Sequence, residues 1–81
     1  MTPEVTVRGL LTAVDWYADG TARRVAVLTP DEREYEVEPG EMCRKLLLHL
    51  RGEVILRGTV HSTGDRQALR VTSFRVLPDE V

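Results

Sequence analysis

The chain has 81 residues, of which 42% are hydrophobic and 30% charged, and its formal net charge at pH 7 is −2. This composition excludes a disordered chain and predicts one small folded domain, residues 1–81, with its core within about residues 4–77. The apolar runs are too short to span a membrane and the first residues lack a signal-peptide pattern, so we expect a cytoplasmic protein without a membrane segment.

The first predicted element is a long strand over residues 5–13, where apolar and polar side chains alternate. The apolar pattern then continues out of phase, so we expect a bulge near Gly9 or Leu10, because glycine inside a strand often marks such a bend. This bulge would turn Trp16 into the mouth of the folded sheet and leave Tyr17 outside, which is the arrangement that we favour. The alternative is that both rings are exposed and form a stacking surface.

Two further strands follow the first. Residues 18–20 carry a turn signal, and residues 22–29 are typical of a second strand. Residues 34–38 alternate strictly, which places Tyr35 and Val37 on the inner face and three glutamates on the outer face. The first three strands therefore form a predicted meander.

The period changes at residues 41–51, which predict a short helix followed by Gly52 as its C′ residue. One face of this helix is apolar and should pack on the core, whereas Leu48 lies on the opposite face, where it needs no special explanation. The apolar face consists of Met42, Cys43, Leu46, Leu47 and Leu50.

Alternation returns in the last third of the chain. Residues 54–60 predict a fourth strand, residues 62–65 a turn, and residues 68–77 a fifth strand. The apolar side chains change phase within this last strand, so we expect an irregularity near Thr72 or Ser73.

The predicted order is β-β-β-α-β-β, an all-β chain with one short helix. Five strands in so short a chain bury little unless the sheet closes, and closure also removes exposed edges.

Glycine stands inside the first and fourth strands, in Val-Arg-Gly at residues 7–9 and Leu-Arg-Gly at residues 56–58. In this order and in these glycines, the chain resembles a small bacterial-type domain of the OB-fold, the oligonucleotide/oligosaccharide-binding fold, over about residues 4–77. The resemblance implies a five-stranded barrel whose open end is capped by the helix. An SH3-like barrel is the alternative, but it does not normally carry such a helix at this point.

Signatures of catalysis and metal binding are missing from the sequence. Cys43, His49 and His61 do not stand at the spacings of structural zinc sites, and Cys43 cannot form an internal disulfide. A nucleophile and base at His61 and Ser62 would point to opposite faces of a strand. The glutamates of the third strand could bind a cation, but a solvated strand face is the more common reason for such a pattern. We therefore expect a non-catalytic protein without a cofactor or a metal.

Charge is unevenly distributed along the chain. Residues 31–41 contain six carboxylates and one arginine, whereas residues 42–77 contain seven basic side chains and two carboxylates. This asymmetry indicates either a polarised binding surface or, more simply, the solvated outer faces of strands and a helix.

The OB-fold resemblance implies that single-stranded nucleic acid binds across the second and third strands, between the first-to-second and fourth-to-fifth loops. Mapped on this chain, the predicted ligand-binding residues are Trp16, Tyr17, Arg23, Arg24, Arg66 and Arg70. Against this reading, three glutamates of the third strand lie in the middle of the same surface, where they would repel phosphates. The alternative is a protein–protein interaction module that uses the acidic third strand or a strand edge. The sequence favours weak nucleic-acid binding narrowly and leaves the oligomeric state open.

Overall fold

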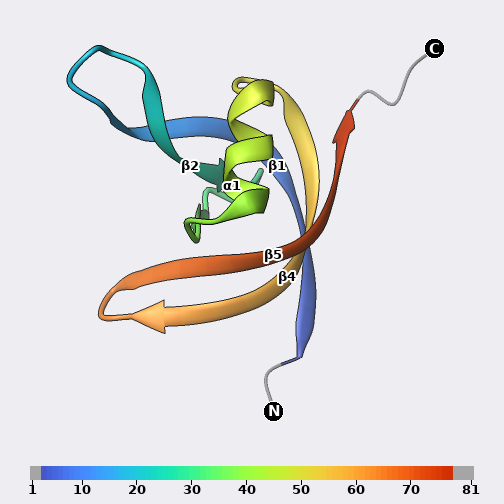
Figure 1. Cartoon of the computed structure of the whole chain (residues 1–81). Helices are drawn as coiled ribbons and strands as arrows, with labels where there is room; N and C mark the ends of the chain where they lie inside the picture. Colours follow the sequence, from blue (N-terminus) through green and yellow to red (C-terminus); the bar gives the residue numbers. More distant parts are fainter. Residues whose placement is uncertain (1–2, 78–81) are drawn as a thin grey trace.

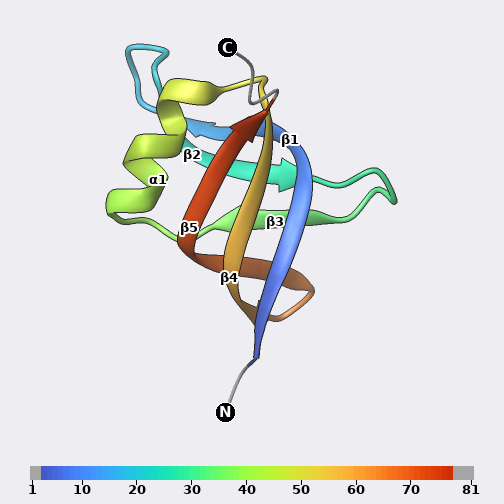
Figure 2. The ribbon, with the colours of Figure 1, turned by 90° about the vertical axis from the view of Figure 1, so that its right-hand side faces the viewer.

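The computed structural model describes residues 3–77, and five strands close into a barrel with the order β1-β2-β3-β5-β4 (Figures 1 and 2). The elements are β1 Glu4–Trp16, β2 Ala22–Leu28, β3 Glu34–Val37, α1 Glu41–Leu46, the 3₁₀ helix η1 Leu47–His49, β4 Glu53–Thr63 and β5 Arg66–Leu77. The predicted order, with the helix between the third and fourth strands, is confirmed and is consistent with OB-fold topology. Among these described residues, neither helix has the length and apolar character required to cross a membrane.

Strand β1 takes part in both halves of the barrel. It pairs with β4 from Glu4 to Leu10 and with β2 from Leu10 to Trp16. The pairing with β4 runs without a register shift through Gly9, so the predicted bulge near Gly9 or Leu10 is wrong, and the shifts lie instead on either side of Asp15. Gly9 has another role: a Cβ at this position would lie 2.2 Å from the Leu28 carbonyl oxygen. Only glycine lets the neighbouring backbone approach this closely.

Gly58 occupies the equivalent position on β4. A Cβ there would lie 2.0 Å from the carbonyl oxygen of Arg70. The register between β4 and β5 shifts between Arg57 and Gly58, where the partner changes from Ser73 to Val71. The predicted irregularity at the middle of the last strand is therefore confirmed, and it leaves Thr72 without a ladder partner on β4.

The helical segment is shorter than predicted, because its nine residues end at His49 rather than at residue 51. Leu50 is extended and Arg51, not Gly52, has a positive φ of 70°. The N–H of Arg51 donates to the Leu11 carbonyl at 2.8 Å, and the N–H of Leu11 donates to the Gly52 carbonyl at 2.9 Å. The backbone groups of Arg51 and Gly52 thus find their hydrogen-bond partners on β1 rather than within the helix. The helix therefore ends just before these two residues.

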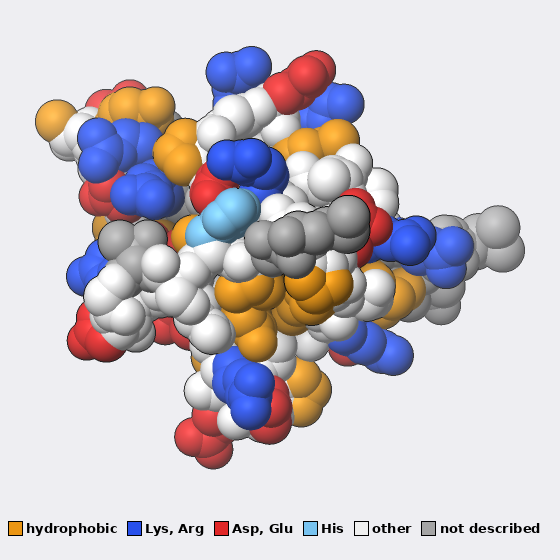
Figure 3. Space-filling model, turned by 90° about the horizontal axis from the view of Figure 1, so that it is seen from below, with side chains coloured by type: hydrophobic (Ala, Val, Ile, Leu, Met, Phe, Trp, Pro, Cys, Tyr) orange, Lys and Arg blue, Asp and Glu red, His pale blue; other side chains and the backbone are white. Residues whose placement is uncertain are grey.

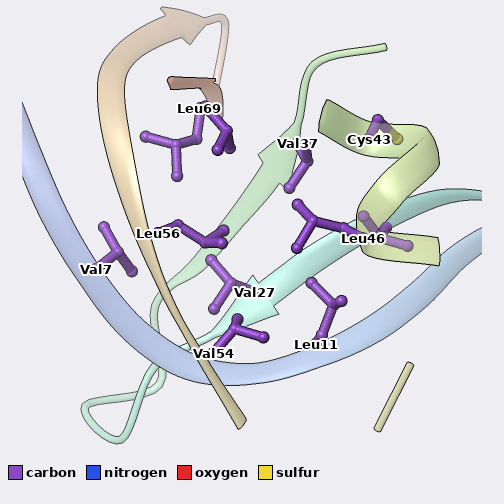
Figure 4. Packing of buried hydrophobic residues seen from close by; sticks show 11 residues of the cluster. Val7, Leu11, Val27, Val37, Cys43, Leu46, Val54, Leu56 and Leu69 are labelled. Atoms are coloured by element: carbon purple, nitrogen blue, oxygen red, sulfur yellow. The ribbon is translucent and has the colours of Figure 1, made fainter. Parts of the chain in front are cut away.

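The core fills the barrel and extends under α1 (Figure 4). Leu11, Leu56 and Leu69 are completely buried, and α1 contributes Cys43 and Leu46 at one end of the cluster. The apolar helix face and the inward position of Val37 are therefore confirmed. The predicted core residues Met42, Leu47 and Leu50 pack against this cluster while half-buried, as Tyr35 does, whereas Leu48 is 82% exposed.

Candidate functional site

Trp16 and Tyr17 stand outside the barrel, at the end of β1. Their exposed fractions are 56% and 57%, so the favoured prediction that Trp16 closes the barrel mouth is wrong. The physical reason is that α1 already covers this end of the core, with Cys43 and Leu46 buried beneath it. The β1–β2 hairpin projects beyond the barrel in Figure 1, and Trp16 is the last residue of β1.

The turn that follows the two aromatic residues is held by short hydrogen bonds. Tyr17 donates its N–H to the Thr21 carbonyl at 2.8 Å, and Gly20 donates its N–H to the Tyr17 carbonyl at 3.0 Å. The Asp19 carboxylate accepts from both the N–H and the hydroxyl of Thr21, at 3.0 and 2.7 Å. Gly20 has a φ of 91°, which favours glycine in a tight turn. These hydrogen bonds fix the backbone conformation of the turn that follows Trp16 and Tyr17.

Arg23 and Asp15 complete the surface of this hairpin. The Asp15 carboxylate accepts from the Arg23 guanidinium and, at 2.9 Å, from the N–H of Trp16. The guanidinium carbon of Arg23 lies 6.0 Å from the centroid of the Tyr17 ring, within the range of a cation–π contact. The hydrogen bond from Arg23, and after it the one from Trp16, lowers the pKa of Asp15 below its ordinary value. The Arg23 cation thus lies beside the exposed Tyr17 ring, on the same hairpin as the exposed Trp16.

The outer face of β2 and β3 is neutralised by its own ion pairs. Glu36 lies between Arg24 and Arg66, with N–O distances of 3.5 and 3.3 Å, and Glu38 pairs with Arg70 at 3.1 Å. Strands β3 and β5 share only two register pairs. The ion pairs of Arg66 with Glu36 of β3, and of Arg70 with Glu38 just after β3, add contacts to this parallel pairing. Three of the predicted ligand-binding arginines, Arg24, Arg66 and Arg70, are therefore paired with glutamates of the predicted third strand. These glutamates are the carboxylates that argued against nucleic-acid binding in the sequence.

A polar hollow of about 650 Å³ lies between β3 and the β4–β5 hairpin. Its lining mixes both signs of charge: Arg33, Glu34, Glu36, Ser62, Gly64, Asp65, Arg66 and Gln67. Charges of both signs are also interspersed on the face of the molecule seen in Figure 3, with hydrophobic side chains between them. The surface on which the OB-fold resemblance predicts nucleic-acid binding therefore carries both signs of charge and is not a positive surface that would attract a phosphate backbone.

Five of the six predicted ligand-binding residues form two groups in the structure. Trp16, Tyr17 and Arg23 gather on the β1–β2 hairpin, whereas Arg24 and Arg66 meet through Glu36. Arg70 lies apart from both groups, beside Glu38. Over residues 3–77, moreover, no three potential metal ligands come together.

Sequence reasoning missed two exposed features of this surface. Leu10 and Leu28 are partners across β1 and β2 and are 50% and 42% exposed. The alternation of the first strand places Leu10 on the outer face, and that of the second strand does the same for Leu28, but their pairing becomes visible only in the register of the sheet. Arg44, on α1, lines the same hollow as Tyr17 of the β1–β2 hairpin, which we call the aromatic hairpin because it carries Trp16 and Tyr17. Arg44 could not be placed there without the tertiary structure.

Comparison with protein-family models, curated proteins and solved structures finds no match to this chain. The architecture is nonetheless that of a five-stranded closed barrel with a helix between β3 and β4, as in the OB-fold.

Proposed function

We propose that this protein is a small non-catalytic OB-fold-like module of bacterial type that binds single-stranded nucleic acid weakly through its β1–β2 hairpin. The observation that carries the proposal is the exposure of Trp16 and Tyr17, each more than half open to solvent, together with the Arg23 guanidinium beside the Tyr17 ring. Large aromatic side chains are usually buried when a core is within reach, and exposed rings next to a cation suit the stacking of bases.

The expected affinity is modest. Stacking of one base on an aromatic ring contributes about 1–3 kcal/mol, so two rings contribute roughly 2–6 kcal/mol. Free energies of binding of about 4 and 8 kcal/mol correspond to dissociation constants of about 1 mM and 1 μM. Arg24, Arg66 and Arg70 add little, because a phosphate must first displace Glu36 or Glu38. Stacking alone therefore corresponds to a dissociation constant of about 40 μM or weaker.

Trp16 is the sole tryptophan, and its fluorescence therefore reports directly on the proposed site. We expect mixed-sequence single-stranded DNA and RNA to change its emission saturably, with weaker binding at about 200 mM than at about 50 mM salt. The Tyr17→Ala variant should bind about 5- to 100-fold more weakly, which corresponds to one lost stacking contact.

Leu48→Ala is the matched control, because Leu48 is exposed on the far face of the helix and should not affect binding. An unchanged Trp16 emission with both nucleic acids at both salt concentrations would refute the proposed function. Equal losses in Tyr17→Ala and Leu48→Ala would also count against it, since the site would then not involve the hairpin.

A protein partner is the second candidate, and the exposed pair of Leu10 and Leu28 favours it. Leu28 also pairs in register with Glu34 of the acidic third strand, so an apolar contact and a carboxylate lie side by side. A second copy of the chain bound here would appear as a dimer in sedimentation experiments, and Leu28→Lys would return it to the monomer. A dimer together with an unresponsive Trp16 would support this function over the first.

A further inference from the structure

A second hollow, of about 420 Å³, lies between the β1–β2 hairpin and the beginning of α1. Its lining residues are Tyr17, Arg23, Arg24, Pro39, Gly40, Cys43, Arg44 and Leu47. Three of these are arginines and none is a carboxylate, while Tyr17 and Leu47 provide apolar walls. The hollow therefore combines positive charge with surfaces on which a base can pack.

Three other hollows among the described residues have a different charge. The one between β3 and the β4–β5 hairpin contains Glu34, Glu36 and Asp65. Its neighbour beside β1 contains Asp15 in addition to two of these carboxylates, and the hollow before α1 contains Glu38 and Glu41. A phosphate that enters any of them meets carboxylates, whereas the hollow beside Tyr17 presents guanidinium groups alone.

Arg44 distinguishes this hollow further. Arg23 and Arg24 are paired with Asp15 and Glu36, but Arg44 is exposed and has no carboxylate within 4.0 Å among the residues that the structure describes. Its guanidinium can thus bind a phosphate without breaking an ion pair of the protein, and it offers bidentate geometry for that purpose.

We infer that a single nucleic-acid strand bound at the aromatic hairpin continues over α1, with a base on Tyr17 and a phosphate on Arg44, rather than across β3. This inference rests on the proposed function and specifies the course of the strand. Going over α1, the backbone passes Arg23 and Arg44, whereas across β3 it passes Glu34, Glu36 and Glu38. The second course is disfavoured because Glu36 and Glu38 already engage its arginines, so a phosphate there must compete with a carboxylate for each cation.

The test uses a fluorescently labelled oligothymidine and its anisotropy, which does not depend on Trp16. We expect Arg44→Ala to weaken binding about fivefold or more at about 50 mM salt and to lower the slope of log affinity against log salt by about 0.7. Arg75→Ala is the matched control, since Arg75 is another exposed arginine without an ion pair among residues 3–77 but lies on β5. It should bind within about twofold of the wild type.

Arg66→Ala tests the competing course across β3, and a loss with this variant but not with Arg44→Ala would overturn the inference. Displacement of the oligonucleotide by thymidine monophosphate at equal concentration would also overturn it, because the hollow would then be a mononucleotide site. If the wild type does not bind at all, the proposed function fails first. Thermal unfolding of each variant is the folding control, and we expect the fold to be kept because all three arginines are exposed.

Discussion

At the scale of single residues, the Asp15 carboxylate ties the two strands of the hairpin together. Asp15 holds Arg23 and the backbone of Trp16 together, and its pKa is lowered first by the hydrogen bond from Arg23 and then by that from Trp16. The folded protein therefore favours the ionised form of Asp15. Its contribution to stability is fully present above the ordinary pKa of 3.8 and is lost as the pH falls through the lowered folded value.

We predict that the emission of Trp16 changes with a midpoint below pH 3.8, when Asp15 is protonated and releases Arg23. The measurement is a fluorescence titration from about pH 7 to about pH 2. Asp15→Asn should abolish this transition while leaving those of Asp19 and Asp31, whose pKa values are also lowered. A midpoint at or above 3.8 would contradict the hydrogen bonds assigned to Asp15.

At the scale of elements, two strands depend on glycine for close contact with their neighbours. At Gly58 an added Cβ would lie 2.0 Å from a backbone oxygen that cannot move without disturbing the β4–β5 ladder. We therefore expect Gly58→Ala to lower the free energy of unfolding by about 3 kcal/mol or more, as measured by denaturant titration.

The matched control is Gly64→Ala in the β4–β5 turn. Nothing lies within 4 Å of a Cβ there, so only the strain of a positive φ of 62° remains. That strain costs an ordinary residue about 1–2 kcal/mol. Similar losses in both variants would show that conformation, rather than the approach of the neighbouring strand, explains the glycine at position 58.

At the scale of the whole molecule, the barrel depends on one small core without a disulfide among the described residues. Leu56 is completely buried at its centre, whereas Leu48 is 82% exposed. We predict that Leu56→Ala lowers the free energy of unfolding by about 2–5 kcal/mol and that Leu48→Ala changes it by less than about 0.5 kcal/mol. Chemical denaturation of the two variants provides the comparison, and a small loss at Leu56 would contradict the described packing.

Much of this architecture was predictable because it depends on local periodicity. Alternation located the strands, the helical period located the core face around Leu46, and the phase change indicated the bulge in the last strand. The end of the helix was not predictable from residues 41–52 alone. It depends on the pairing of Arg51 and Gly52 with Leu11, a residue far away in the sequence.

The candidate site was predictable only as a set of residue types. The sequence alone determined the order of the elements along the chain and most of the inward side chains, since these follow from the period of two and from turn chemistry. The tertiary structure alone decided that Trp16 stays outside, because α1 occupies the barrel mouth, and that Glu36 and Glu38 occupy Arg24, Arg66 and Arg70. Ion pairs and exposure depend on which strands become neighbours, and register between distant segments is not written in local periodicity.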